Sequence, residues 1–163
     1  MNGGASKPTS SRDLSPDVAP GGTGEESSVL FLCNHNTIRS PMAEALTRSL
    51  HPRRLYTASA GLQEGWIDPF VVAVLAEQGI DAGDHEPQLL DHIDDEAFDV
   101  IVTLTPSAHH RALELTRTAA VAVEYWPVPD PTATQGSREQ RIAAYREARD
   151  YIRARITERF GAR

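Results

Sequence analysis

The sequence predicts one α/β domain built around a parallel β-sheet. Short apolar runs alternate four times with segments of helical spacing, a pattern typical of parallel strands joined by right-handed helical crossovers. The chain has 163 residues, about the length of a single domain. Hydrophobic residues make up 40% and charged residues 24%, ordinary globular values that exclude a wholly disordered chain.

Four segments are predicted as strands. Ser28–Leu32 is a short apolar run with β-branched and aromatic members, as expected for a strand buried on both faces. Phe98–Leu104 is predicted as another buried strand. We expect two more strands over Leu55–Ala60, ended by Gly61, and over Val121–Trp126.

Two of the predicted helices have clear start signals. Pro41–Leu50 shows helical spacing, with Ser40 as the expected N-cap and Pro41 at the first helical position. Asp68 and Pro69 open a second helix that Gly79 ends. The N-cap role accounts for Asp68 without assigning it any chemistry.

Three further helices are expected. Leu89–Ala97 and Pro106–Arg117 are short, and a long last helix begins after Ser137, where Gln140 completes a capping box. The apolar stripe of the last helix predicts its buried face. That stripe consists of Tyr145, Ala148, Ile152, Ile156 and Phe160.

Residues 1–27 are expected to be a flexible tail before a folded domain over residues 28–163. The tail is rich in Gly, Ser, Pro, Thr and Asp, so it cannot bury enough surface to offset its chain entropy. Its segment 21–24, Gly-Gly-Thr-Gly, is interpreted as a linker, because no strand precedes it and no Gly-Lys pair follows it.

The formal net charge of −7 is unevenly distributed, with −2 on residues 1–27, −9 on 28–136 and +4 on 137–163. The acidic body argues against a nucleic-acid partner. The basic end lies on the last helix and has two interpretations, a solvated face or a contact with an acidic partner or membrane surface. Its arginines are Arg138, Arg141, Arg146, Arg149, Arg153 and Arg155.

We expect a cytoplasmic protein with no membrane partner. Cys33 is the single cysteine, which suits a reducing compartment and excludes a disulfide within the chain. The first residues lack the apolar segment of a secretory signal. The longest apolar run, Phe70–Ala76, is far below the ~18 residues of a membrane span. The sequence leaves the oligomeric state open.

The loop after the first strand carries the candidate chemistry. Between a strand end and a helix start, successive backbone N–H groups form a cradle for an anion, and the helix dipole adds positive potential. Arg39 offers a planar fork that matches two oxyanion oxygens. The predicted phosphate-binding residues are Asn34, His35, Asn36, Thr37, Ile38, Arg39 and Ser40.

Cys33, at the base of this cradle, is the predicted nucleophile. The inward N–H groups, the dipole and Arg39 all favour its thiolate, and the Ser40 hydroxyl can donate to the sulfur. Asn36 tolerates the left-handed backbone that a tight loop requires. Two alternatives stay open: Cys33 as a buried structural residue, and His35 as either a substrate contact or a solvent-facing side chain.

Asp130 is the predicted general acid. It lies in the proline-rich segment Pro127–Pro131 after the last predicted strand, from which it can reach the cysteine loop across the carboxyl edge of the sheet. The alternative is an ordinary turn residue. No metal or cofactor is predicted, because a zinc site is not expected without a second cysteine, and the adjacent His109 and His110 do not share a helix face.

These residues resemble a known family. Val29–Leu46, with Cys33-Asn-His-Asn-Thr-Ile-Arg39-Ser40-Pro41 at its centre, looks like the low-molecular-weight protein tyrosine phosphatases and their thioredoxin-coupled arsenate reductase relatives. The resemblance continues through Ser59-Ala60-Gly61 and Asp130-Pro131 and covers about residues 28–160.

The resemblance implies a three-layer, flavodoxin-like fold with a four-stranded parallel sheet. It also implies a cysteinyl-phosphate on Cys33, phosphoryl oxygens held by Arg39, a structural role for Asn36, and Asp130 protonating the leaving phenol and then activating water. The expected substrate is a phosphorylated protein or a small phosphate ester.

The sequence departs from the family pattern in three places. Ile38 replaces the second cysteine that many of the phosphatases carry, and Thr132 and Ala133 stand where aromatic residues often follow Asp-Pro. Trp66 either supplies an aromatic wall or packs internally. The segment 103–107 lacks the cysteines of the reductase relay, so arsenate reduction needs an external thiol.

Three functions therefore remain open from sequence. The first is hydrolysis of phosphate monoesters, protein phosphotyrosine in particular, through Cys33. The alternative is an arsenate reductase that depends on an external thiol. The third is a non-catalytic module of the same fold that binds oxyanions.

Overall fold

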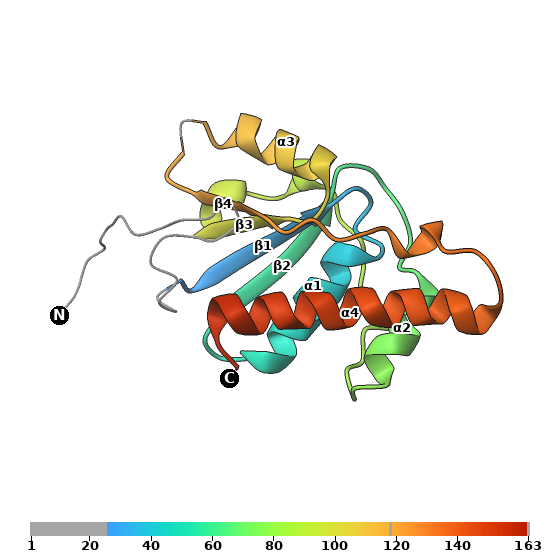
Figure 1. Ribbon diagram of the computed structural model, residues 1–163. Helices are drawn as coiled ribbons and strands as arrows, with labels where there is room; N and C mark the ends of the chain where they lie inside the picture. Colours follow the sequence, from blue (N-terminus) through green and yellow to red (C-terminus); the bar gives the residue numbers. More distant parts are fainter. Residues whose placement is uncertain (1–25, 118, 163) are drawn as a thin grey trace.

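Four parallel strands form one sheet in the order β2-β1-β3-β4. The computed structural model describes residues 26–117 and 119–162. The strands are β1 (Ser28–Cys33), β2 (Tyr56–Gly61), β3 (Val100–Thr103) and β4 (Ala122–Tyr125). The helices are α1 (Arg39–Leu50), α2 (Pro69–Ala76), α3 (Pro106–Leu115) and α4 (Arg138–Phe160). Figure 1 shows α3 on one side of the sheet and α1, α2 and α4 on the other, the predicted three-layer α/β fold.

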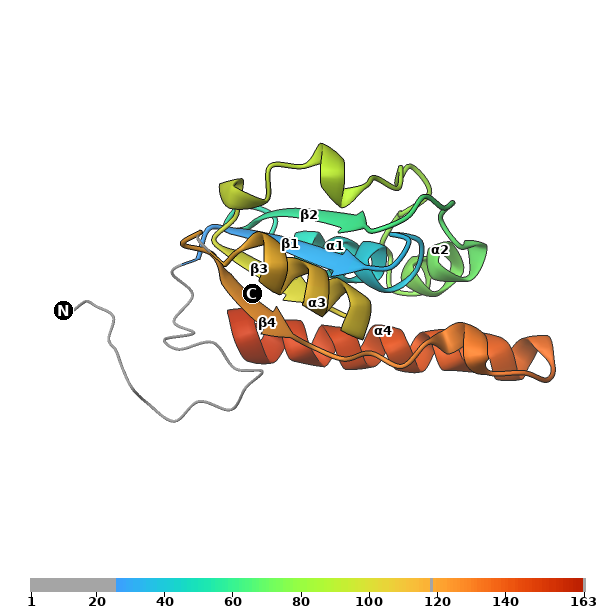
Figure 2. The same cartoon turned by 90° about the horizontal axis from the view of Figure 1, so that it is seen from above.

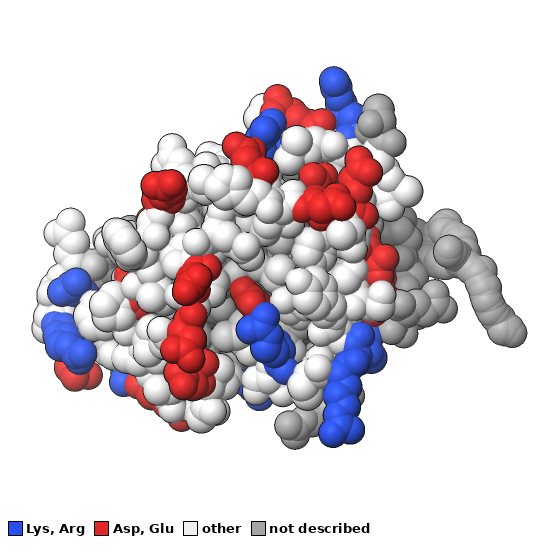
Figure 3. Space-filling model, turned by 180° about the vertical axis from the view of Figure 1, so that it is seen from behind, with Lys and Arg blue, Asp and Glu red and all other residues white. Residues whose placement is uncertain are grey.

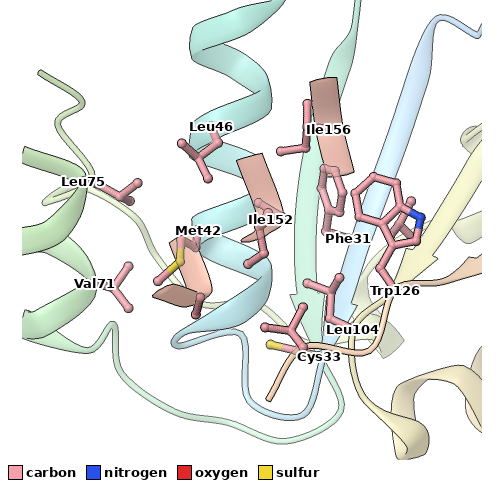
Figure 4. Close-up of a cluster of buried hydrophobic side chains, with 14 of the residues drawn as sticks. Phe31, Cys33, Met42, Leu46, Val71, Leu75, Leu104, Trp126, Ile152 and Ile156 are labelled. Carbon is pink, nitrogen blue, oxygen red and sulfur yellow. The ribbon is translucent and has the colours of Figure 1, made fainter. Parts of the chain in front are cut away.

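The central strand β1 is apolar along its whole length because both of its faces are covered. Val29, Phe31 and Cys33 belong to the hydrophobic cluster beneath α1, α2 and α4. Leu30 and Leu32 belong to the cluster on the α3 side. This alternation follows from the two-residue period of a strand. Figure 4 shows the larger cluster, with Cys33 at its edge where β1 ends.

Helix α4 buries the predicted apolar stripe, and the capping box of Ser137 and Gln140 is present. The predicted arginine face needs a correction, because Arg149 is buried. Its Nη1 atom donates to the carbonyl of Val74 at 2.8 Å and to Glu77 at 2.7 Å. Glu77 also accepts from Arg146, and these two arginines lower the pKa of Glu77 to about 2. They therefore attach α4 to α2 through charge-assisted hydrogen bonds.

Two predicted local structures are wrong. Helix α1 starts at Arg39 without a side-chain cap, because the predicted cap, Ser40, points inward to other partners. The segment predicted as a helix over Leu89–Ala97 forms two short 3₁₀ turns, Leu90–His92 and Asp95–Ala97. The two residues between them, Ile93 and Asp94, are extended. Asp94 also accepts a hydrogen bond from the N–H of Glu96, and this local contact interrupts the helix.

The start of the described chain is attached to the body. Of the predicted tail, residues 1–25 and the glycine-rich segment 21–24 lie outside the described residues. Glu26 pairs with Arg159 at 2.8 Å, and the Ser27 N–H donates to Asp99 at 2.8 Å. These contacts place the described chain in the fold two residues before β1.

The carboxyl ends of the strands lie at one edge of the sheet. Chain connections run in opposite directions from β1 and β3, which are neighbours, so this edge between them is where open α/β sheets bind ligands. Figure 2 shows the loop after β1 and the connection from β4 to α4 at this same end of the sheet. Among the residues described, no helix combines the length and apolarity that crossing a membrane requires.

Candidate active site

The loop between β1 and α1 presents a row of backbone donors without protein acceptors. Within residues 26–117 and 119–162, the N–H groups of His35, Asn36, Thr37 and Ile38 make no hydrogen bond to the protein. Orphaned backbone N–H groups are rare in folded proteins. Four in succession between a strand and a helix form a cradle suited to an anion.

Asn36 gives the loop its curvature. Its φ of +58° lies in the left-handed region, and it is the one non-glycine residue with positive φ among those described. Asparagine tolerates this conformation better than most residues. Asn36 thus adopts the left-handed conformation that the sequence predicts for it. This conformation turns the backbone in the middle of the cradle.

The Cys33 thiol faces this loop from the end of the hydrophobic cluster. It is 3% exposed, and its Sγ atom lies 2.9 Å from the Ser40 hydroxyl and 3.4 Å from the Ser40 backbone N–H. The Ser40 hydroxyl accepts from the Asn36 amide at 2.8 Å, and its own proton has two acceptors in reach, the Cys33 sulfur and, at the longer distance of 3.4 Å, the Ala60 carbonyl. The sulfur therefore lies within hydrogen-bond distance of a hydroxyl and a backbone N–H.

A buried polar network holds Asn36 in place. Its Oδ1 atom accepts from the backbone N–H of Gln88 at 3.0 Å, and its Nδ2 atom donates to Ser40 and, at 2.9 Å, to Ser59. Because a backbone N–H can only donate, this contact fixes the orientation of the Asn36 amide. Ser59 in turn donates to Glu44 of α1.

His85 completes the network. Its Nε2 atom lies 3.0 Å from Oδ1 of Asn36, and since Oδ1 is an acceptor, His85 is protonated on Nε2. Burial lowers the pKa of His85, although Glu44 opposes this. The neutral ring therefore supports Asn36 at neutral pH.

Gly61 allows the cradle to pack on the end of β2. A Cβ atom there would lie 2.5 Å from the His35 carbonyl carbon and 2.6 Å from the Asn36 nitrogen. The Asn34 carbonyl accepts from the N–H groups of Leu62 and Gln63 at 2.7 and 2.9 Å. This close approach is the physical reason for a glycine as the last residue of β2.

The base of the loop is also attached to β3. The hydroxyl of Thr105, which caps α3, donates to Oδ1 of Asn34 at 2.8 Å. The loop is thus hydrogen-bonded to the segments after both neighbours of β1. Its shape is fixed by protein contacts, so no ligand is needed to form the cradle.

Arg39 connects the cradle to the Asp130 segment. Its Nη1 atom donates to the carbonyl of Val128 at 3.0 Å. Within the described chain, Nε and Nη2 of Arg39 have no protein acceptor. The predicted fork is thus anchored by one nitrogen, and the other two remain for an oxyanion.

Asp130 lies in the field of Arg39 and also caps a 3₁₀ turn. Its Oδ1 atom accepts from the N–H and the hydroxyl of Thr132 at 2.9 and 2.7 Å. Partial burial raises the pKa of Asp130, but these hydrogen bonds and the charge of Arg39 outweigh it and lower the pKa overall. The turn role and a role in chemistry are compatible, because both contacts use the same oxygen.

Asp68 has the structural role that the sequence predicts. It caps α2 by accepting from the N–H of Phe70 at 2.8 Å, and its other oxygen accepts from the Tyr145 hydroxyl at 2.8 Å. Its own N–H donates to the Thr37 carbonyl at 3.1 Å. Asp68 therefore joins the cradle to α2 and α4.

The rim of the site includes an exposed aromatic ring. Trp66 is 88% exposed, so it does not pack internally, and it lines a groove with Gln63, Gln88 and His92. His35 is exposed and lies 2.9 Å from the Gln63 amide oxygen, at the junction of groove and cradle. Among the described residues, no group of three or more His, Cys, Asp or Glu side chains is placed to hold a metal.

Sequence reasoning missed the supports of Asn36. Glu44, His85 and Gln88 come from a helix and an irregular segment, and no spacing in the sequence places them beside the loop. Ser59 and Glu44 lay within segments that the sequence singled out, but without this role. The remaining predicted residues, Thr37 and Ile38, lie in the cradle, where the Ile38 side chain packs on the core.

A buried cysteine beside a loop of free backbone N–H groups, with an arginine at the helix start, makes a site suited to binding an oxyanion. The family described as low molecular weight phosphotyrosine protein phosphatase matches residues 28–161. The chain belongs to this family.

Similar proteins within the family carry different names. An arsenate reductase of Shouchella clausii is 35% identical over 129 residues, which cover 78% of this chain and 91% of that one. A solved structure described as an arsenate reductase in the phosphate binding state has a TM-score of 0.70 at 23% identity, covering 81% and 95% of the two chains, and supports the fold. The tyrosine phosphatase AmsI of Erwinia amylovora has a TM-score of 0.62 at 25% identity, covering 78% and 91%.

Proposed function

We propose that the protein hydrolyses phosphate monoesters, with protein phosphotyrosine as the first substrate to test. The observation that carries this proposal is the set of four unpaired N–H groups over the Cys33 sulfur. These donors suit a tetrahedral oxyanion whose charge increases in the transition state. Arg39 contributes two further donors to the same oxyanion.

The proposed reaction has two steps. Cys33 attacks phosphorus, the bond to the ester oxygen breaks, and Asp130 donates its proton to the leaving oxygen. Water then attacks the cysteinyl-phosphate, the S–P bond breaks, and Asp130 accepts the proton of the water. The reaction needs no reductant, which fits a chain with a single cysteine.

The rim supports an aryl ester as substrate. The exposed ring of Trp66 borders the groove beside the cradle and offers a face for stacking a phenyl ring. No aromatic residue follows Asp130-Pro131, so an aromatic wall must come from the Trp66 side.

Arsenate reduction is the second candidate, favoured by the name of the similar protein from Shouchella clausii. Cys33 would attack arsenate and displace hydroxide. An external thiol would then attack Cys33 Sγ, releasing arsenite and leaving a mixed disulfide, which a second external thiol would reduce. Two electrons thus come from two external thiols, because the chain holds one cysteine.

One set of assays separates these functions. We expect turnover of an aryl phosphate and of a phosphotyrosine peptide by the wild type, about 100-fold less turnover of the peptide by Asp130→Asn, and none by Cys33→Ala. Arsenate-dependent oxidation of glutathione or mycothiol, without aryl phosphate turnover, would replace the phosphatase with the reductase. Aryl phosphate turnover by Cys33→Ala would contradict both.

A further inference from the structure

A pair of arginines lies beside the active site at the start of α4. The guanidinium carbons of Arg138 and Arg141 each lie 5.2 Å from the centroid of the Phe70 ring. Such stacking restricts a guanidinium while leaving its N–H edge free to bind. Phe70 therefore contacts both guanidinium groups through its ring.

Neither arginine has an anionic partner within the described residues, and both side chains lie on the surface. The other arginines of the predicted basic face are used differently, since Arg146 and Arg149 pair with Glu77. Two cations in the first turn of a helix are unfavourable because the dipole is positive there. An anion bound beside the two guanidinium groups would offset this unfavourable charge.

Contacts connect the pair to the cradle. The Phe70 ring packs against the Tyr145 ring at 5.0 Å, the Tyr145 hydroxyl donates to Asp68, and the Asp68 N–H donates to the Thr37 carbonyl. Tyr145 also senses the charges of both Asp130 and Arg141. Helix α4 itself contacts the 3₁₀ turn Pro131–Ala133 that Asp130 caps.

The start of α4 carries charges of both signs. Figure 3 shows both basic and acidic side chains scattered over the visible face, with basic atoms among those at its left edge. Asp68 and Asp130 are already engaged, with Tyr145 and with Thr132, and Glu139 is the acidic residue in the first turn of α4. Arg138 and Arg141 against Glu139 leave this turn with a net positive charge for an incoming acidic group.

We propose that Arg138 and Arg141 bind an acidic side chain that flanks the phosphorylated residue of a peptide substrate. This inference rests on the proposed phosphatase function and names its substrate class. The occupant is a carboxylate on the same peptide, because the stacked guanidinium groups offer bidentate donors at the rim of a site whose cradle already takes the phosphate.

The test compares phosphotyrosine peptides that differ only in having Glu or Gln on both sides of the phosphotyrosine. We expect the wild type to prefer the Glu peptide about fivefold in kcat/KM at low salt, mainly through KM, with the preference decreasing as salt rises. In R138Q/R141Q the two peptides should have about the same kcat/KM. R138K/R141K should restore part of it, because lysine keeps the charge without the fork.

The matched control is R53Q/R153Q, which removes the same charge. Arg53 is exposed between α1 and β2, and Arg153 contacts Gln78. This control should keep the preference. Equal kcat/KM for the two peptides in the wild type, or a loss of preference in R53Q/R153Q equal to that in R138Q/R141Q, would overturn the proposal.

Binding separates this inference from the proposed function. With Cys33→Ala as a non-reacting protein, fluorescence anisotropy should show tighter binding of the Glu peptide, and the difference should disappear when R138Q/R141Q is added. If the Glu peptide binds more tightly but the wild type turns over neither peptide, the phosphatase function is wrong and the role of the arginine pair stands. If both peptides are turned over with equal kcat/KM, the phosphatase function stands and the role of the arginine pair is wrong.

Discussion

The Ser40 hydroxyl lies 2.9 Å from the Cys33 sulfur, and the Asn36 amide donates to that hydroxyl at 2.8 Å. The serine that resembles a helix cap in the sequence instead places its hydroxyl between the Cys33 sulfur and the Ala60 carbonyl. The hydroxyl is oriented by Asn36, which His85 and Gln88 hold from the other side. The reactivity of Cys33 thus depends on a chain of buried hydrogen bonds.

Ser40→Ala should slow the reaction of Cys33 with an electrophile. The loss of a hydrogen bond to an anion costs about 1.5–3 kcal/mol, so alkylation by iodoacetamide near neutral pH should slow about tenfold or more. Ser49→Ala, on the exposed side of the same helix, is the control and should alkylate like the wild type. Equal rates for Ser40→Ala and the wild type would contradict the assigned role.

Gly61→Ala should disrupt the cradle. Its Cβ would meet loop backbone at 2.5 Å, and backbone cannot turn aside as a side chain can. We expect aryl phosphate turnover to fall about 100-fold, because small displacements of positioning groups are costly.

Gly79→Ala is the matched control for that variant. Gly79 has a φ of +76° and open space around its Cβ position, so alanine there costs about 1 kcal/mol of stability and leaves the cradle intact. Denaturant titration and turnover, measured for both variants, separate the two effects. Normal turnover in Gly61→Ala would show that the loop does not need this close approach.

His85 should make stability depend on pH. Burial lowers its pKa in the folded protein, so its contribution is complete above the unfolded pKa of about 6.5 and is lost as pH falls through the lower folded value. The decrease in unfolding free energy between about pH 7 and about pH 5 should be smaller in His85→Gln than in the wild type. His110→Gln, at an exposed position, should behave like the wild type, and an unchanged decrease in His85→Gln would disprove the assignment.

Thr132→Val should move the alkaline limb of the kcat/KM profile to higher pH. The Thr132 hydroxyl donates to Asp130 and lowers the pKa of that carboxyl, so its removal raises the pKa and keeps the acid protonated to higher pH. Thr134→Val, two residues further along an exposed segment, is the control. A shift toward lower pH, or none, would exclude Asp130 as the general acid.

The layered fold follows from local patterns. The apolar run of β1, the Asp-Pro start of α2 and the Ser-x-x-Gln start of α4 each express a local rule, and each element formed near its predicted position. Errors arose where tertiary partners compete with local preference. Ser40 is the clearest case, because its contact with Cys33 overrides capping.

The cradle residues were predictable because they are contiguous in sequence. The supports of Asn36 were not, because His85 and Gln88 lie 49 and 52 residues away in a segment without periodicity. The arginines of α4 also differ in burial because of partners that are distant in the sequence. Arg149 is buried by a pairing with Glu77 of the segment after α2, whereas Arg138 and Arg141 stack on Phe70.

The central claim is that Cys33 attacks phosphorus within the cradle. Its most direct test is rapid acid quenching during turnover of a radiolabelled aryl phosphate, followed by mass spectrometry of the labelled peptide. The account predicts label on Cys33 of the wild type, equal or greater label in Asp130→Asn, and none in Cys33→Ala. Turnover of the ester with the label absent from Cys33 would contradict it.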